Sequence, residues 1–531
     1  MDAKTPHNRT QGPKRPRTSR TRKQNGGITV PSSAAKGATI GNVVSASLNQ
    51  QTKGHGHAGG HGSIPHSVAG NGTRRQAGGS TMGGVGSGAG SRPSLGSVTA
   101  QGGRPSASMQ SGAGSLVSRR NFLVGAIGVG AAAVAIGAGA TAYSAYEASK
   151  PDTSVSCLEV PKSAVSTLDD FSALDSPDTL LTMSGTLDLA LGTLVFCNDD
   201  DLAVCLVPAD TGSPLSTVSV VSLGSATETE VLSEAVGASQ GYQIFDVRGT
   251  SSGLVWTEAN VLDGTWRIYT AKLSQLNLGT PQLVDEGDST WETPTLAAVD
   301  KYAFWQVLPN VSADGTTSNL PESSLRRATM GSNDVETVYT NKRRMGTPVY
   351  AAEDGVVITG RADSSTVYYQ LTKVDASSGD ISHQVTLPAT MAPLEAGWGK
   401  NGFMWSFENI YNTTDGLSNL GTYTPMTDAT DDGYKDAKWF CFGRTPSAAP
   451  AWCGNVLMVK STYSVCGVDL DNKQYCAIDV DNGAAKYGEY LATTGAHQRV
   501  VTYTSIDYQP VNADAVQTCR VKIWEPTKTT A

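Results

Sequence analysis

Short runs of apolar and β-branched residues, bounded by Gly, Pro, Asp and Asn, recur from about residue 186 to the end of the chain. Apolar runs of this length between turn residues predict β-strands. No amphipathic pattern long enough for a helix of three turns interrupts the series. The pattern therefore predicts an all-β body, with representative strands at 253–258, 302–306, 355–359, 402–406, 455–459 and 500–503.

A proline precedes four of these runs, and successive prolines are 54, 45 and 57 residues apart. That spacing matches one four-stranded blade of a β-propeller. Seven such units predict seven blades, with six or eight blades, or a pair of β-sandwiches, as alternatives. The last unit lacks its final strand, and we expect residues 154–162 to supply it and close the ring. The units begin near residues 186, 242, 294, 348, 393, 450 and 490.

A second signal is a set of turns rich in Asp and Gly, at Pro208–Gly212, Val374–Gly379 and Ile478–Gly483. Asp caps a turn with its side chain, and Gly adopts the positive φ that many turns require. These turns resemble those between the third and fourth strands of blades in the TolB-like and quinoprotein-like propeller families. The resemblance implies the same β-propeller fold that the spacing of the strands predicts.

The first 117 residues have a different composition. Residues 1–120 contain 24 Gly and no aromatic residue, and 16 Lys and Arg stand against one acid, Asp2. Such a segment cannot bury enough apolar surface to offset its chain entropy, so we predict that residues 1–117 are disordered. Subtracting residues 1–120 from the whole-chain totals of 40 basic and 48 acidic residues leaves 24 and 47, so the body is acidic. The tail lacks aromatic side chains for base stacking, and we expect no nucleic-acid partner.

Between tail and body, an uncharged stretch from Asn121 to Tyr146 follows the pair Arg119-Arg120. About 20 apolar residues suffice to cross a bilayer. The arginine pair followed by Phe122 and Leu123 resembles the bacterial twin-arginine (Tat) export signal. The resemblance implies a signal or transmembrane helix at 118–146, which the twin-arginine export machinery would recognise.

That segment places residues 147–531 outside the cytoplasm and the tail inside it. We expect a protein of the bacterial cytoplasmic membrane, N-terminus in. Secretion after cleavage at small residues near 138–142 is the alternative. A plain single-pass membrane anchor with flanking arginines, the alternative to an export signal, predicts the same topology, with the tail inside and residues 147–531 outside the cytoplasm.

All eight cysteines lie in the body. Outside the cytoplasm an even number favours disulfides, although eight cysteines allow 105 connectivities. Cysteines that simply fill a core as small apolar residues are the alternative. Pairing neighbours in the sequence, and then the two ends, suggests Cys197–Cys205, Cys441–Cys453, Cys466–Cys476 and Cys157–Cys519.

Signatures of catalysis are sparse. The body has only two histidines, His383 and His497, and it shows no GxSxG nucleophile elbow at a strand-to-helix turn, no HExxH and no phosphate-binding glycine motif. The acidic runs at 198–201 and 479–483 lack the ligand spacing of a calcium loop and are typical of turns. The sequence therefore predicts no metal and no cofactor.

Matching positions in several units carry tryptophan with a polar neighbour. A repeated Trp most often packs between blades, while the alternative places it with its neighbours at a ligand-binding mouth. Positive charges in other units would contribute to such a mouth. The candidate ligand-binding residues are Trp256, Glu258, Trp305, Gln306, Arg361, Trp405, Glu408 and Lys460.

These features favour a non-catalytic binding or scaffold module at the cell envelope, because a propeller is a rigid ring with variable loops. Its ligand would be an envelope glycan, peptide or protein. The alternative is an extracellular propeller enzyme, a polysaccharide lyase or glycoside hydrolase that uses Glu258 or Glu408. A redox propeller that holds a quinone is a third hypothesis, and it needs an axial Trp and a metal site.

Overall fold

The computed structural model describes residues 155–210, 213–311, 321–364, 366–389, 391–407, 421–429, 434–511 and 514–528. Within these ranges, no helix combines the length and hydropathy of a membrane span. The predicted tail and export segment lie outside the described residues, as do Arg119, Arg120, Phe122, Leu123 and Glu408.

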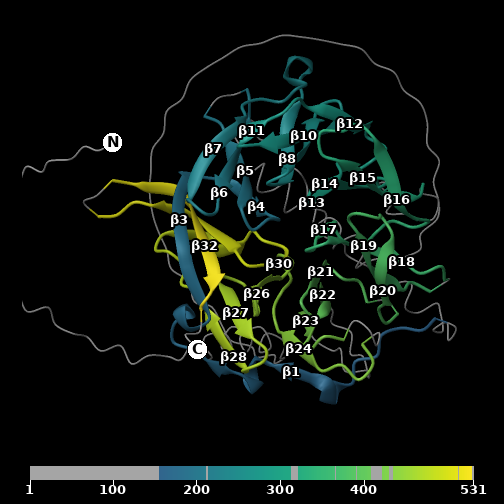
Figure 1. The fold of residues 1–531 in the computed structure, drawn as a ribbon, viewed down its shortest axis with the longest axis vertical. Helices are drawn as coiled ribbons and strands as arrows, with labels where there is room; N and C mark the ends of the chain where they lie inside the picture. Colours follow the sequence, from purple (N-terminus) through teal and green to yellow (C-terminus); the bar gives the residue numbers. More distant parts are fainter. Residues whose placement is uncertain are drawn as a thin grey trace, which may run out of the picture.

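The described chain is all-β, as the sequence predicts, and its sheets form a propeller-like ring (Figure 1). Six sheets follow one another along the chain, each a series of antiparallel strands from one continuous stretch. The first three comprise β4 (Leu194–Cys197), β5 (Leu202–Pro208), β6 (Ser216–Ser222) and β7 (Thr227–Leu232); β8 (Gln243–Thr250), β9 (Gly253–Asn260), β10 (Thr265–Ser274), β11 (Asn277–Leu278) and β12 (Gln282–Gly287); and β13 (Thr295–Val299), β14 (Tyr302–Val307), β15 (Ser323–Thr329) and β16 (Val335–Asn341).

The next three sheets repeat the arrangement. They comprise β17 (Tyr350–Ala351), β18 (Gly355–Arg361), β19 (Tyr369–Asp375) and β20 (Ile381–Thr386); β21 (Glu395–Gly399), β22 (Gly402–Phe407), β23 (Gly421–Pro425) and β24 (Trp439–Phe442); and β25 (Ala451–Cys453), β26 (Val456–Lys460), β27 (Val465–Asp469) and β28 (Gln474–Ala477).

A further sheet, which we call the closing sheet, combines both ends of the described chain. Its order is β29 (Ala484–Leu491), β31 (Val500–Tyr508), β32 (Val516–Pro526) and β3 (Leu181–Ala190). β3 pairs with β32 from Leu181↔Pro526 to Ala190↔Thr518. The expectation that residues 154–162 supply the closing strand is therefore wrong. The closing strand is the longer run that begins at Leu181.

The residues before β3 run along the outside of three other sheets. Leu158 N–H donates to Thr386 O of β20 (2.7 Å), and β1 (Val165–Thr167) and β2 (Ser172–Ala173) pair in parallel with β24 and β28. We call residues 158–173 the belt; Figure 1 shows this early part of the chain beside β24 and β28. The belt adds backbone partners to outer strands that would otherwise be free edges.

The second strand of each sheet is buried on both faces. Gly253 to Ala259 of β9, all of β22 and all of β26 are buried. A strand between two neighbouring sheets needs apolar side chains on both faces, which explains why these runs are continuous rather than alternating. The repeated tryptophans occupy these strands, and Trp256, Trp305 and Trp405 are fully buried.

The Asp-rich turns are confirmed in part. Asp375 Oδ1 accepts the N–H groups of Ser377 (2.9 Å) and Ser378 (2.7 Å), and Gly379 has φ +78°, in the turn between β19 and β20. These hydrogen bonds lower the pKa of Asp375. The turn at 479–483 differs, because it links β28 to β29 of another sheet. In that unit Asp469 caps the turn between the third and fourth strands.

The predicted disulfides are wrong, because no disulfide joins any of the eight cysteines in the described part of the chain. Cys466 faces Ala477 and Cys476 faces Gly467, so their side chains lie on opposite faces of one sheet. Cys205 lies opposite Val195, which offsets it by two residues from Cys197. The members of the other two pairs lie in separate parts of the ring. Cys441 is in the β21–β24 sheet, whereas Cys453 is in the β25–β28 sheet. Cys157 precedes Leu158, which contacts β20, whereas Cys519 is on β32.

The closing sheet also holds a chain of ion pairs. Arg520 on β32 binds both carboxylate oxygens of Asp188 on β3 (2.8 Å each) and lies 3.3 Å from Asp481. Lys522 lies 2.9 Å from Asp481 and 3.1 Å from the buried Glu489. Charged groups on β3 and β32 thus join the two chain segments that pair in the closing sheet.

This arrangement predicts a pH dependence of stability. Arg520 holds the pKa of Asp188 below its usual value of about 3.9. The ion pair therefore stabilises the fold above about pH 4, and this contribution is lost as the pH falls through the lowered pKa. Because Asp188 is half exposed, we expect Asp188→Asn to cost less than about 1 kcal/mol at pH 7. In urea titrations the difference from wild type should shrink as the pH falls below about 4 and vanish below the lowered pKa of Asp188; a constant difference at every pH would contradict the assignment.

Candidate functional site

The candidate residues of the second sheet bind each other and a neighbouring loop. Trp256 Nε1 donates to Glu258 Oε1 (3.0 Å), and the Glu258 carboxylate accepts the N–H groups of Val236 (2.6 Å) and Gly237 (2.8 Å). Glu258 is fully buried. Its carboxylate therefore fastens the connection between β7 and β8.

The matching residues of the third sheet have similar partners. Trp305 Nε1 donates to Asp285 Oδ2 (2.6 Å), and Asp285 also binds Arg326 (2.7 Å). The Gln306 amide oxygen accepts the hydroxyl of Thr295 (3.0 Å). These contacts link β12 of one sheet with β14 and β15 of the next.

The remaining candidates lie in other sheets. Arg361 lies over the ring of Tyr369, and Trp405 stacks on Tyr423 at 5.9 Å between ring centroids. Lys460 is buried and donates to Tyr487 O (2.7 Å), and burial lowers its pKa to about 8. The described candidate residues lie in different sheets, and a ligand-binding role for the set stays a prediction.

A different group of residues surrounds a hollow of about 540 Å³ where the closing sheet meets the sheet of β4 to β7. We call it the seam hollow. Residues from both ends of the described chain line it: Asp200, Gln498, Arg499, Glu525, Pro526, Thr527 and Lys528.

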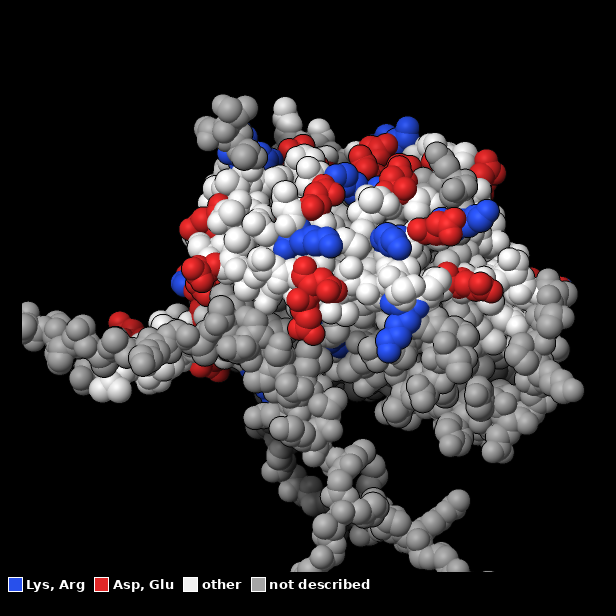
Figure 2. All heavy atoms as spheres, turned by 90° about the horizontal axis from the view of Figure 1, so that it is seen from below, with Lys and Arg blue, Asp and Glu red and all other residues white. Residues whose placement is uncertain are grey.

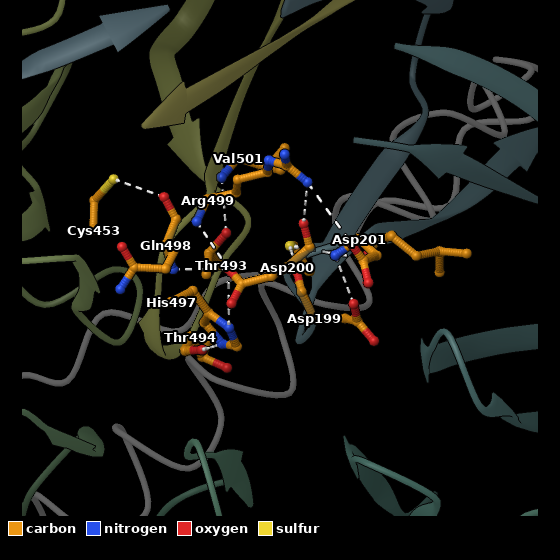
Figure 3. A network of polar contacts seen from close by, with 12 residues as sticks. Asp199, Asp200, Asp201, Cys453, Thr493, Thr494, His497, Gln498, Arg499 and Val501 are labelled. Carbon is orange, nitrogen blue, oxygen red and sulfur yellow. Dashed lines mark hydrogen bonds and ion pairs between the residues drawn. The ribbon is translucent and has the colours of Figure 1, made fainter. Parts of the chain in front are cut away.

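Asp200, in the turn between β4 and β5, lines one side of the hollow, and Figure 3 shows the polar contacts of this turn. Asp200 Oδ1 accepts the N–H groups of Gln498 and Arg499 (2.8 Å each). Asp199 Oδ2 accepts the N–H and the hydroxyl of Ser251 (2.7 and 2.8 Å), in the turn between β8 and β9. The acidic run at 198–201 thus joins three sheets by hydrogen bonds. Across the described residues, no group of His, Cys, Asp and Glu is arranged to hold a metal.

A short segment before Gln498 connects the sheets on either side of the seam hollow. β30 (Gly495–His497) pairs in parallel with β25, and Thr493 forms a parallel bridge with Cys197 of β4. His497 Nε2 lies 3.0 Å from Thr494 O, and its Nδ1 lies 3.8 Å from Asp200 Oδ1. The backbone just before Gln498 and Arg499 is therefore hydrogen-bonded to β25 in one sheet and to β4 in another.

The side chain of Arg499, between β30 and β31, extends to the turn that carries Asp199, Asp200 and Asp201, as Figure 3 shows. Its Nε donates to Glu525 Oε1 (2.9 Å), and its Nη1 donates to Asp200 O (3.1 Å). The hydrogen bond to Glu525 raises the pKa of Arg499. These bonds use Nε and Nη1, and the side chain is 30% exposed. Arg499 is thus a preorganised cation beside two carboxylates.

Two thiols border this network, and neither is suited to nucleophilic attack. Cys197 Sγ donates to Asp199 O (3.2 Å), and Cys453 Sγ donates to Gln498 O (3.8 Å). Burial raises the pKa of Cys197 to about 11 and that of Cys453 to about 12. At neutral pH both are protonated, and the thiolate is the reactive form. Neither thiol is therefore a reactive nucleophile at neutral pH.

The hollow combines both signs of charge within a short distance. Arg499 and Lys528 supply positive charge, and Asp200 and Glu525 supply negative charge. Figure 2 shows that basic and acidic side chains are likewise interspersed on one outer face of the ring. Such a surface offers no extended field of one sign and suits a ligand that carries both charges.

Sequence reasoning missed this hollow because its residues come from opposite ends of the chain. The acidic run at 198–201 is visible in the sequence, whereas its partners lie some 300 residues later. No motif or spacing connects Asp200 with Arg499 or Glu525. Only the closure of the ring places them together.

Neither a family model nor a curated protein matches this sequence. The chain is similar to solved structures of a puromycin hydrolase (13% identity, TM-score 0.39, 66% of this chain and 54% of that chain) and of prolyl oligopeptidase B from Galerina marginata (11%, 0.39, 67% and 52%). It is also similar to TolB from Acinetobacter baumannii (9%, 0.31, 52% and 62%). The chain spans about half the length of the first of these similar structures.

This comparison corrects the expected function. The similar structures are mostly peptidases, rather than scaffold modules, polysaccharide lyases or glycoside hydrolases. At this identity and TM-score the likeness carries no activity over to the chain. The fold itself rests on the strand pairing described above.

Proposed function

We propose that the protein recognises the charged ends of short peptides in the seam hollow, as the substrate-selecting ring of a peptide-hydrolysing system. The observation that carries this proposal is the mixed charge of the hollow: a guanidinium and an ammonium group beside two carboxylates. A peptide in water carries an ammonium and a carboxylate at its ends, which complement these groups.

The dimensions support the same ligand class. Ligand-binding pockets commonly have volumes of about 300–1,000 Å³, and the hollow has about 540 Å³. A tripeptide spans roughly 10 Å when extended. The peptide carboxylate would bind Arg499 and Lys528, and its ammonium group would bind Asp200 and Glu525. Fixed backbone amides hold Asp200 in place, so this carboxylate loses little freedom on binding.

Variants of the hollow test this proposal. Lys528→Met removes one cation, and we expect it to weaken binding of trialanine by about 3- to 10-fold, since a hydrogen bond to a charged group contributes roughly 1.5–3 kcal/mol and exposure reduces it. Isothermal titration of the purified full-length chain measures this change. The control is Lys301→Met, at an exposed lysine between β13 and β14. Equal affinity for wild type and Lys528→Met would contradict the proposal.

We also propose that the closing sheet counts as the last blade of a seven-bladed propeller. Six sheets from consecutive chain segments and one composite sheet support this number. The pairing of β3 with β32 would then close the ring through both chain ends. Cleavage of the chain between β3 and β4 should weaken this closure and lower the melting temperature, because β3 is then no longer covalently joined to β4.

The export segment and the domain limits at 117 and 146 also remain proposals. The pair Arg119-Arg120 before an uncharged stretch supports recognition by the twin-arginine machinery. The ring from 147 onward would then lie outside a bacterial cytoplasmic membrane, where small peptides would reach the seam hollow. The Asp-rich turns support kinship with TolB-like propellers.

A further inference from the structure

The outer strands of the ring differ in whether their edges are covered. The belt provides backbone partners next to β20, β24 and β28. Within the described residues, the outer strands β3, β7, β12 and β16 have no strand on their outer side. The chain itself therefore demonstrates that an extended segment, running parallel, fits against the outer edge of this ring.

Three of the four uncovered strands carry acids that are neutralised by arginines. On β3, Asp188 binds Arg520. On β12, Asp285 binds Arg326 (2.7 Å) and Glu286 lies 3.5 Å from Arg267. On β16, Glu336 binds Arg327. Each acid on these edges thus has a basic partner from the ring itself.

β7 departs from this pattern. Its acids, Glu228 and Glu230, are exposed, and no ion pair engages either of them among the described residues. They lie opposite Val221 and Ser219 of β6, which offer no positive charge. Alternate residues of a strand are about 7 Å apart and lie on one face. The edge of β7 therefore presents two unneutralised carboxylates, spaced like alternate side chains of an extended polypeptide.

We propose that the edge of β7 is a docking site for an extended basic segment of another polypeptide. Backbone groups of β7 would pair with this segment as the belt pairs with β24 and β28. Lysine or arginine at alternate positions would bind Glu228 and Glu230. Strand addition of this kind gains affinity from main-chain hydrogen bonds and specificity from alternate side chains. The inference goes beyond the proposed function, because β7 does not line the seam hollow.

The test uses the full-length chain and a fluorescein-labelled peptide of alternating lysine and valine. Fluorescence anisotropy at low ionic strength should show saturable binding. Glu228→Gln combined with Glu230→Gln should weaken this binding by about fivefold or more, since two ion pairs are lost. The matched control is Glu234→Gln, which removes an exposed acid just after β7 and should leave the affinity unchanged.

Two further measurements separate strand pairing from simple charge attraction. A peptide that is N-methylated at alternate residues keeps its charge but loses backbone donors, and it should bind much more weakly. The substitutions Glu228→Lys and Glu230→Lys should shift the preference to a peptide of alternating glutamate and valine. Absence of binding to the wild type, equal binding of the N-methylated peptide, or equal weakening by Glu234→Gln would overturn the proposal. Trialanine binding reports the seam hollow separately.

Discussion

Arg444→Ala is expected to destabilise the ring by about 3–5 kcal/mol, because it leaves a buried carboxylate without a partner. Arg444 Nη2 lies 2.6 Å from Glu395 Oε2, and the two side chains are 2% and 5% exposed. Arg444 also donates to the carbonyl oxygens of Thr445 (3.2 Å) and Ala448 (3.0 Å), which holds the connection between β24 and β25. Urea denaturation monitored by tryptophan fluorescence measures the loss.

A double variant separates the unpaired charge from lost packing. Replacing both Arg444 and Glu395 with Leu removes the pair without leaving a charge behind, and it should be markedly less destabilising than Arg444→Ala alone. A loss of less than about 1 kcal/mol for Arg444→Ala would show that water reaches Glu395 and that the pair is not buried in solution.

Trp256→Ala is expected to cost about 3–5 kcal/mol through the cavity that it creates between sheets. Trp256 is fully buried, stacks on Tyr269 at 5.7 Å between ring centroids, and donates to Glu258. The smaller change Trp256→Phe keeps most of the packing but removes this donor. We expect it to cost about 1 kcal/mol more than Trp405→Phe, since the Trp405 indole N–H has no hydrogen-bond partner among the described residues.

Urea titrations of both phenylalanine variants measure this difference. Equal losses would mean that the Trp256 hydrogen bond adds nothing beyond packing. A loss greater for Trp405→Phe would contradict the assignment of Glu258 as a fastening group for the β7–β8 connection.

The local pattern of the sequence was sufficient to predict the fold class. The second strands, such as β22 and β26, are buried on both faces and so appear as continuous apolar runs with a proline ahead of them. The closing strand was harder to identify. Leu181–Ala190 alternates polar and apolar residues at an outer edge, and its partner lies more than 300 residues later in the sequence. Closure depends on this pairing between chain ends, which no local pattern encodes.

The cysteines and tryptophans show a related limit. The sequence spacing suggested a disulfide between Cys466 and Cys476, but the strand register puts these side chains on opposite faces of the sheet. A shift of one residue in register decides the face, and sequence spacing does not determine register. The repeated Trp256, Trp305 and Trp405 mark the buried second strands. The seam hollow escaped prediction because it forms only where the ring closes.

The most direct test of the central claim compares peptides with free and blocked ends on the full-length chain by isothermal titration. The seam hollow should bind trialanine, bind N-acetyl-trialanine and trialanine amide at least about threefold more weakly, and bind the doubly blocked peptide weakest of all, since each block removes one charge that the hollow complements. Equal affinity for all four peptides, or no binding of trialanine at millimolar concentration, would contradict recognition of peptide ends by Arg499, Lys528, Asp200 and Glu525.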